Sequence, residues 1–241
     1  MSEAAPVPEN PGPASRTYRE LLRATGKLQP RALFQVEDVQ EPVIALTIDD
    51  GPSPRTHEIL DLLERHDCRA TFFVHTAPLE RDAWARGVAS RMMEAGHEIA
   101  NHMPEDRASI LLSPAEFAAE FLRAHELLRS LGFLPRFFRA ARGFYHAERM
   151  LPALKRMAYY ERFILGSYPP WDLFLPFPRS YAQQLAARAF PGAIFVFHDG
   201  TARDVRRVER TLAALSSFLP MLIERGYRLE PLGRVMERAI A

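Results

Sequence analysis

Residues 43–54, VIALTIDDGPSP, decide the fold. The first six are almost entirely apolar and predict a short strand, and the Asp-Asp-Gly-Pro that follows ends it with a sharp turn. Asp49 and Asp50 therefore stand together at the end of a strand. Two adjacent carboxylates in an apolar setting repel one another unless a cation or an arginine lies between them. The alternative is a helix N-cap followed by an ordinary turn, which this segment alone does not exclude.

Strand and helix patterns alternate along the rest of the chain. Alternation of this kind implies parallel strands joined by helices, and six or seven such units predict an α/β fold with a closed or nearly closed barrel. Strands are expected at residues 43–48, 69–75, 97–101, 136–140, 162–167, 193–199 and 227–232. Helices are expected at residues 57–66, 84–96, 113–132, 148–160, 180–190 and 208–226. Active sites of such barrels gather where strands end and loops begin.

The chain is expected to form a single domain with a short N-terminal extension. With 241 residues, 47% of them hydrophobic, it can bury one large core. Residues 1–40 are the predicted extension. Within it, residues 1–15 are rich in proline, alanine and glutamate and are expected to be disordered, while residues 18–25 are expected to form a short helix. Residues 41–241 are the predicted domain.

Composition excludes several classes of partner. The 31 basic and 30 acidic residues give a net charge of +1, so the overall charge does not attract the chain to nucleic acid. The single cysteine, Cys68, excludes an internal disulfide and a cysteine-based zinc cluster. No window approaches the roughly 20 apolar residues that span a bilayer, so only peripheral membrane contact is expected. The N-terminus lacks the basic start and apolar stretch of a secretory signal, which predicts a cytoplasmic protein.

Residues that can bind a metal follow several predicted strands. His102 follows the strand at 97–101, and Asp106 comes four residues later, a spacing that places both on one face of a helical turn. Together with a carboxylate from Asp49 or Asp50 they could share one ion, the alternative being a loop histidine and a helix cap. His75 also follows a strand, and a rim histidine without a role in the site is the favoured interpretation.

Five short segments occur in a characteristic order: LTIDDGPSP, RATFFV, GHEIANH, FFRAARG and IFVFHDG. In order and spacing they resemble the signature segments of the polysaccharide deacetylases, the NodB-homology family or carbohydrate esterase family 4. The resemblance runs from Val43 to Leu232. It implies a distorted (β/α) barrel of about seven strands. It also implies a carbohydrate deacetylase, a hydrolase that uses a divalent metal to remove N-acetyl, or sometimes O-acetyl, groups from sugars.

The resemblance implies a role for each matching residue. Asp49 matches the general base, and Asp50 and His102 match the first two metal ligands. Arg139 matches the arginine that pairs with the base and orients it. His198 matches the general acid that protonates the departing amine. The divalent ion polarises the amide carbonyl and lowers the pKa of bound water, which provides a nucleophile at neutral pH.

The same match predicts the walls of the substrate pocket. Val196 is expected to line the pocket for the acetyl methyl group, with Trp171 as a second wall. Asp172 is assigned the role of orienting His198, although the loop SYPPWDLFLPFP at 167–178 aligns only loosely with the family's fourth segment. The aromatic residues of this loop either cap the barrel or form a platform for sugar rings or lipid.

Two positions depart from the family pattern. Where the family has a second histidine this chain has Asp106, which is expected to be the third ligand, and a carboxylate would shift the preference from Zn²⁺ towards Mn²⁺, Fe²⁺, Co²⁺ or Mg²⁺. The alternative is that Asp106 does not reach the ion. Where the family has a tyrosine this chain has Arg142, whose backbone N–H is expected to stabilise the oxyanion. Its guanidinium either clamps a phosphate or carboxylate of the substrate or points to solvent.

Three functions are compatible with these residues. The first is a hydrolase, dependent on Zn²⁺, Co²⁺, Mn²⁺ or Fe²⁺, that removes N-acetyl groups from an aminosugar-containing saccharide. The second is a deacylase or deformylase of a lipid-linked aminosugar at the inner membrane face, a substrate that Arg142 would suit. The third is a metal-free carbohydrate-binding protein that keeps the barrel. In all three cases the partner is a saccharide.

Overall fold

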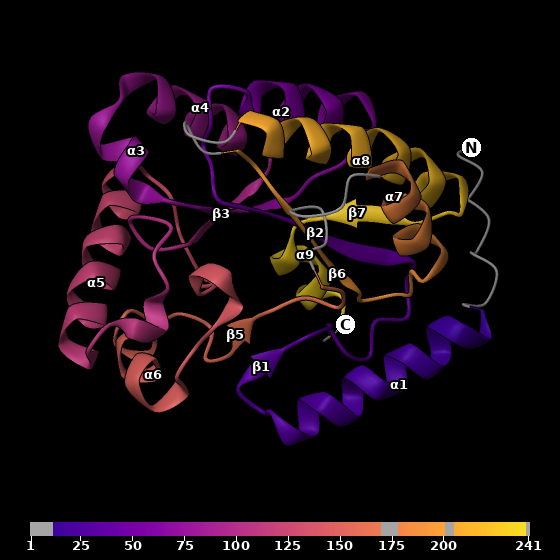
Figure 1. Ribbon diagram of the computed structural model, residues 1–241, viewed down its shortest axis with the longest axis horizontal. Coiled ribbons are helices and arrows are strands. Elements are labelled where there is room, and N and C mark those ends of the chain that lie inside the picture. The colour runs from indigo at the N-terminus through magenta and orange to yellow at the C-terminus, as the bar shows by residue number, and fades with distance from the viewer. Residues whose placement is uncertain (1–11, 170–177, 201–204, 240–241) are drawn as a thin grey trace.

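The computed structural model describes residues 12–169, 178–200 and 205–239. Trp171, Asp172 and most of the N-terminal segment expected to be disordered lie outside these residues. Within the described part, helices surround parallel strands, which confirms the predicted α/β class (Figure 1).

The centre of the sheet is β2, Val43–Asp49, whose seven residues are all buried. On one side it pairs with β3 (Thr71–Val74), which pairs in turn with β4 (Glu98–Asn101). On the other side it pairs with β6 (Ile194–His198), and β7 (Arg228–Glu230) pairs with its first residues. All of these pairings are parallel. The unbroken apolar run of β2 suits a parallel strand that is buried on both faces.

The register of the sheet brings the carboxyl ends of its strands to one edge. Asp49, the last residue of β2, lies beside Phe73 on β3 and beside His198, the last residue of β6. The His102 N–H, just after β4, donates to the carbonyl of Val74 at the end of β3 (3.1 Å). Residues that follow these strands therefore meet at the same edge, as the positional argument from the sequence predicts.

The strand expected at residues 136–140 is reduced to one isolated bridge to β4. The Asn101 N–H donates to the Phe137 carbonyl (3.0 Å), and the Arg139 N–H donates to the Asn101 carbonyl (3.2 Å). Pro135, directly before this segment, has no N–H with which to extend the ladder. The segment still occupies the next place around the ring.

Isolated hydrogen bonds also complete the ring on its far side. The short strand β5 (Phe163–Ile164) pairs with β1 (Ala32–Leu33) in a separate two-stranded sheet. Three residues after β5, the Ser167 N–H donates to the Ile194 carbonyl of β6 (2.8 Å). The barrel is therefore distorted, because single bonds replace ladders around part of its circumference.

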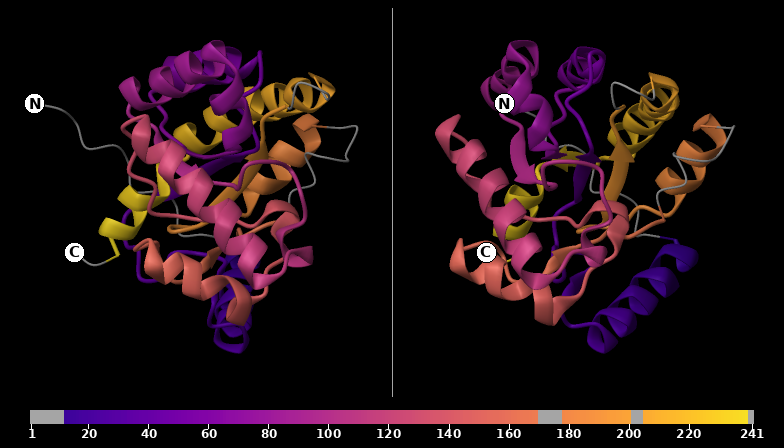
Figure 2. Two further views of the ribbon diagram at one scale, coloured as in Figure 1. Left: turned by 90° about the vertical axis from the view of Figure 1, so that its left-hand side faces the viewer. Right: turned by 60° about the vertical axis from the view of Figure 1, so that its left-hand side comes forward.

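Helices cover the barrel (Figures 1 and 2), and their buried side chains form an apolar core with those of the strands. The side chains of Ile59, Val88 and Phe218, from three different helices, belong to the same buried cluster as Phe72 of β3. Helix α8 packs on both α2 and α7, and α5 packs on α6. The bounds are α2 (Thr56–Arg65), α3 (Thr76–Arg81), α4 (Ala83–Glu94), α5 (Pro114–Ser130), α6 (Ala147–Arg156), α7 (Pro178–Ala187), α8 (Val205–Glu224) and α9 (Leu232–Glu237), with single 3₁₀ turns at Ser109–Leu111 and Ala141–Gly143.

Two element predictions differ from the structure near the C-terminus and after β3. The strand expected at 227–232 ends at Glu230, because Pro231 cannot donate to a ladder and is instead the N-cap of α9. The helix α3 directly follows β3 and has no counterpart among the predicted helices. None of the helices in the described ranges is long and apolar enough to cross a membrane.

The first helix, α1 (Pro13–Leu28), contains the short helix expected at 18–25 and packs on the barrel. The Tyr18 ring stacks on the Tyr168 ring, with centroids 4.9 Å apart and planes at 12°. Its hydroxyl donates to the Ser167 carbonyl (2.6 Å). In every view α1 lies on the opposite side of the molecule from α2 (Figures 1 and 2). The domain boundary at residue 40 stays a prediction.

The buried residue His97, just before β4, makes stability depend on pH. Its Nδ1 accepts a hydrogen bond from the Ala70 N–H (3.1 Å), and burial lowers its pKa to about 4. A histidine whose folded pKa is lowered binds its proton only in the unfolded chain between about pH 4 and 6.5, so stability is lost as the pH falls through this range. We expect this loss to be about 3 kcal/mol and to disappear in His97→Gln.

Denaturant unfolding between pH 7 and pH 4 measures this effect. The exposed His57 provides the control, because His57→Gln removes a histidine without removing a buried one. In His57→Gln the free energy of unfolding should depend on pH as it does in the wild-type protein. The same pH dependence in all three proteins would contradict the assignment to His97.

Candidate active site

The turn after β2 has an unusual backbone. Asp50 and Gly51 both have positive φ, 68° and 59°. Such a conformation typically costs a non-glycine residue on the order of 1 kcal/mol or more and is common at functional sites. Glycine is required at position 51, since a Cβ there would lie 2.5 Å from Asp199 Oδ2. The turn therefore depends on close packing against the residue that follows His198.

Asp199 holds this turn in place. Its carboxylate accepts hydrogen bonds from the Ser53 hydroxyl (2.7 Å), the Gly200 N–H (2.6 Å) and the Thr56 hydroxyl. Its own N–H donates to the Asp49 carbonyl (2.8 Å). Burial raises the pKa of Asp199 to about 6, although these hydrogen bonds act in the opposite direction. Asp199 is not among the residues predicted from the sequence, where its only signal is an acid directly after the strand-end histidine.

Asp49 and Arg139 form a buried ion pair between Asp49 Oδ1 and one guanidinium nitrogen, Nη1. The same nitrogen donates to the Thr47 hydroxyl (2.9 Å). Nε and Nη2 donate to the carbonyls of Ile164 (3.0 Å) and Leu165 (2.9 Å). Arg139 is therefore held by four acceptors, and it holds one oxygen of the Asp49 carboxylate in place.

The second oxygen of Asp49 faces His198. Asp49 Oδ2 lies 4.0 Å from His198 Nε2, and the His198 carbonyl accepts a hydrogen bond from the Thr211 hydroxyl (2.7 Å). Val196, two residues before His198 on β6, is 8% exposed. The structure thus brings the predicted base, acid and pocket residue together at the end of two adjacent strands.

Asp50, His75 and His102 form a buried group that could hold a metal ion. One potential ligand atom from each lies within 4.8 Å of the others. Asp50 Oδ1 is 3.3 Å from His75 Nε2 and 3.6 Å from His102 Nε2. His102 Nδ1 lies 2.8 Å from the Arg139 carbonyl, a contact in which the ring donates its proton and leaves Nε2 available as a ligand.

The environment of these three residues fits a divalent cation. Neither ring nitrogen of His75 has a hydrogen-bond partner of good geometry among the described residues, although both are buried. Burial raises the pKa of Asp50, but the nearby imidazoles of His102 and His75 outweigh burial and hold the pKa well below its usual range. Burial lowers the pKa of His102, yet Asp50 and Asp49 raise it overall. A buried carboxylate beside an unsatisfied imidazole is what a metal site requires.

Asp106 does not belong to this group. Its Oδ1 lies 3.7 Å from Arg142 Nε, and its side chain is 36% exposed. After His102 the chain turns at Met103, which has a φ of 71°, and the Pro104 carbonyl bonds to α3. Asp106 lines the same cavity as Asp50 and His102, but its carboxylate is not among the ligand atoms that lie within 4.8 Å of one another. Whether it ligates an ion stays a prediction.

The group takes its third member from a strand end that the sequence analysis set aside. His75 directly follows β3, which lies between β2 and β4, so the rule that placed Asp50 and His102 at this edge also placed His75 there. The positional signal was present, whereas the motif spacing directed attention to Asp106.

One cavity of about 800 Å³ is lined by Asp49, Asp50, His102, Arg139, Val196 and His198, whereas His75 lies behind its wall. Arg142, with a side chain 60% exposed, lies on its wall. The roles expected for Trp171 and Asp172 concern residues outside the described part of the chain. The wall also includes apolar side chains from α1 and from around β5, namely Tyr18, Leu22, Phe34, Leu165 and Tyr168.

Known proteins similar to this chain belong to the family that the order of its motifs predicts. A family model described as polysaccharide deacetylase matches residues 37–161. The chain belongs to the polysaccharide deacetylase family. A chitooligosaccharide deacetylase of Bradyrhizobium sp. (strain ANU 289) is 32% identical over 199 residues, which cover 78% of this chain and 88% of the relative. A peptidoglycan-N-acetylglucosamine deacetylase of Bacillus cereus is 28% identical over 189 residues, covering 78% and 85%.

Solved structures of the family share the fold. A peptidoglycan N-acetylglucosamine deacetylase has a TM-score of 0.77 at 22% identity, covering 88% of this chain and 96% of that one. A family 4 pseudoenzyme from Bacillus anthracis has a TM-score of 0.73 at 19% identity, covering 87% and 70%. Identities this low establish the fold alone. The predicted distorted barrel and carbohydrate-deacetylase class are thus confirmed at the level of the family.

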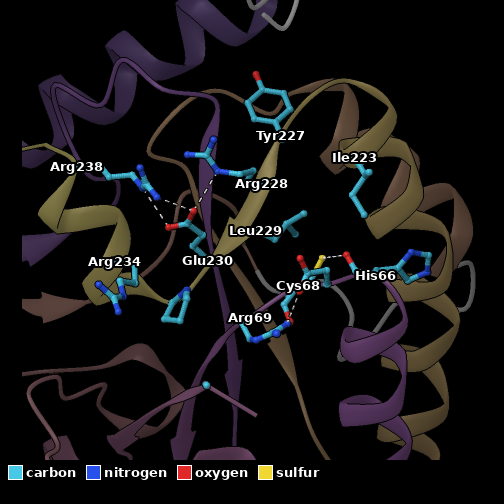
Figure 3. Close-up of a pocket in the computed structure, with 13 residues that line it drawn as sticks. His66, Cys68, Arg69, Ile223, Tyr227, Arg228, Leu229, Glu230, Arg234 and Arg238 are labelled. Atoms are coloured by element: carbon cyan, nitrogen blue, oxygen red, sulfur yellow. Dashed lines mark hydrogen bonds and ion pairs between the residues drawn. The ribbon is translucent and has the colours of Figure 1, made fainter. Parts of the chain in front are cut away.

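A second cavity, of about 560 Å³, lies at the opposite ends of the strands (Figure 3). Glu230 there accepts from Arg228 (3.2 Å) and Arg238 (3.1 Å), so these charges compensate one another. Burial raises the pKa of the Cys68 thiol to about 12, which makes it a poor nucleophile. None of the predicted site residues lines this cavity.

The assignment of the third ligand can be tested by metal affinity. His75→Ala should weaken Zn²⁺ binding by about a hundredfold or more, because it removes a neutral nitrogen ligand. Asp106→Ala should leave the affinity unchanged, since Asp106 pairs with Arg142. Competition with a chromophoric chelator measures both. The reverse pattern would restore Asp106 as the ligand.

The role of Asp199 can be tested by stability. Asp199→Ala leaves the buried Ser53 hydroxyl and Gly200 N–H without their acceptor and removes a contact of Thr56, and we expect it to lower the free energy of unfolding by about 2 to 4 kcal/mol. Asp82→Ala is the control, because Asp82 is exposed and makes no side-chain cap to α4. Equal stability of the two variants in urea unfolding would show that Asp199 does not hold the turn.

Proposed function

We propose that this chain is a metal-dependent hydrolase that removes N-acetyl groups from an aminosugar-containing saccharide. The observation that carries the proposal is the buried Asp50–His75–His102 group, which lies beside the Asp49–Arg139 pair and His198. The names of the relatives, chitooligosaccharide and peptidoglycan-N-acetylglucosamine deacetylases, support the same substrate class.

Asp50, His75 and His102 would hold the metal. Two imidazoles and one carboxylate suit Zn²⁺ or Co²⁺, and also accept Fe²⁺ or Mn²⁺. The single carboxylate leaves positive charge on a divalent ion, unlike the Asp-His-Asp set expected from the sequence. When bound, such an ion polarises an amide carbonyl and makes water a better nucleophile at neutral pH.

Asp49 and His198 divide the proton transfers. Arg139 occupies Asp49 Oδ1, so Oδ2 is the oxygen available to accept a proton from the attacking water. His198, 4.0 Å from that oxygen, is placed to give a proton to the nitrogen as the C–N bond breaks. An amine leaves poorly without this proton, and imidazole can supply one near neutral pH.

The walls of the cavity would position the substrate. Val196 would contact the acetyl methyl group, and the Arg142 backbone N–H would stabilise the oxyanion. The Arg142 guanidinium lies 3.7 Å from the Asp106 carboxylate. An anionic group of the substrate would therefore compete with Asp106 for this side chain. Trp171 as a second wall and Asp172 as the orienter of His198 remain part of the proposal.

A second candidate substrate is an aminosugar with a longer acyl chain or a lipid link. The apolar wall formed by Leu22, Phe34 and Leu165 favours it, because an acetyl group alone does not fill a cavity of this size. A metal-free binding protein is the weaker alternative, since it gives the two buried imidazoles beside Asp50 no role.

Acetate release from chitooligosaccharides with Zn²⁺ or Co²⁺ tests the proposal. The wild-type protein should release acetate, and Asp49→Asn should lower kcat by about 10² to 10⁴ while it keeps its metal affinity. The exposed Asp82→Asn is the control and should keep the full rate. No acetate release with Zn²⁺, Co²⁺, Fe²⁺ or Mn²⁺ would contradict the proposal.

The second substrate is distinguished in the same assay. A longer N-acyl chain, or a lipid-linked aminosugar in place of a free oligosaccharide, should react faster than the acetylated oligosaccharide if the apolar wall binds it. A rate that falls as the acyl chain grows would exclude this candidate and leave the N-acetyl saccharide.

A further inference from the structure

Arg207 reaches the candidate metal group from the first turns of α8. Its Nη1 forms an ion pair with Asp50 Oδ2, and its side chain is 20% exposed. Arg207 also lines the cavity that contains His102 and His198. The reaction described above assigns it no role.

The two oxygens of Asp50 have different partners. His75 Nε2 and His102 Nε2 approach Oδ1, at 3.3 and 3.6 Å, whereas the guanidinium contacts Oδ2. The same carboxylate therefore serves the candidate metal group through one oxygen and a fixed cation of the protein through the other.

The charges around the group are already balanced by the protein. Arg139 compensates Asp49, and Arg207 compensates Asp50. A divalent ion that enters must share Asp50 with a guanidinium of the same sign, in a buried setting where charges are only weakly screened.

We propose that Arg207 is a built-in competitor of the divalent ion and sets the metal affinity of the site. This inference rests on the proposed metal site. The site fills at a higher concentration of free ion than the same three ligands would require without Arg207. Arg139 acts differently. Its backbone carbonyl accepts a hydrogen bond from His102 Nδ1 and so leaves His102 Nε2 available as a metal ligand.

The affinity for the ion alone tests this role without an activity assay. In Arg207→Gln the Kd for Zn²⁺ and Co²⁺ should fall by about tenfold or more, because the cation on Oδ2 is gone. Arg207→Lys keeps the positive charge but changes the geometry of the hydrogen-bond donors. Its Kd should lie between those of Arg207→Gln and the wild-type protein. A chelator competition assay measures Zn²⁺, and the visible absorption of Co²⁺ reports its coordination.

Arg206→Gln is the matched control. It lies one residue earlier on the same turn of α8, removes the same charge and has an exposed side chain. Its Kd should stay within about twofold of the wild-type value, because exposed charges are screened by water and salt. Circular dichroism and thermal unfolding of the metal-free proteins check that all variants are folded.

The outcomes separate the inference from the function on which it rests. Tighter binding in Arg207→Gln alone supports the inference. Unchanged or weaker binding in that variant overturns it, since weaker binding would mean that the guanidinium orients Asp50 for the ion. If the wild-type protein and all variants fail to bind either ion, the proposed metal site fails and the inference fails with it.

Discussion

The buried ion pair between Arg139 and Asp49 is the interaction on which the rest of the site depends. The guanidinium joins β2, through Asp49 and Thr47, to the carbonyls of Ile164 and Leu165 beside β5. It does so where single hydrogen bonds replace ladders in the barrel. Removal of one partner from a buried pair typically costs about 3 to 5 kcal/mol, because the other charge remains without compensation. The pair thus connects β2 to the segment around β5 and fixes one oxygen of the Asp49 carboxylate at the same time.

Two adjacent carboxylates would repel one another at the end of β2, and the fold separates their environments. Asp49, the last residue of β2, faces Arg139. Asp50, with positive φ, faces the other way and contacts His75, His102 and Arg207. The backbone strain that directs Asp50 is held by Asp199, which packs against Gly51 and accepts hydrogen bonds from the turn. The left-handed conformation of Asp50 therefore gives the two neighbouring acids different partners.

Motif order and strand position were not equally informative about the site. The order of the segments identified Asp49, Asp50, His102, Arg139 and His198, and the structure brings all five together. Spacing within the loop after β4 pointed to Asp106, but the turn at Met103 carries that carboxylate to Arg142. His75 joins the group because β3 lies between β2 and β4, and adjacency in a sheet is not visible as spacing in the chain.

The sequence by itself determined the α/β class, the parallel strands and the edge at which the functional residues meet. These follow from local patterns, namely apolar runs, helical periodicity and the residues that end each strand. Only the tertiary structure decided which side chains share an ion, which cations compensate the two acids and how the barrel closes. His75 follows β3, Asp199 follows β6 and Arg207 belongs to α8. Their contacts with the turn after β2 depend on how these distant segments pack. Local pattern carries no information about such contacts, since they are set by sheet order and register.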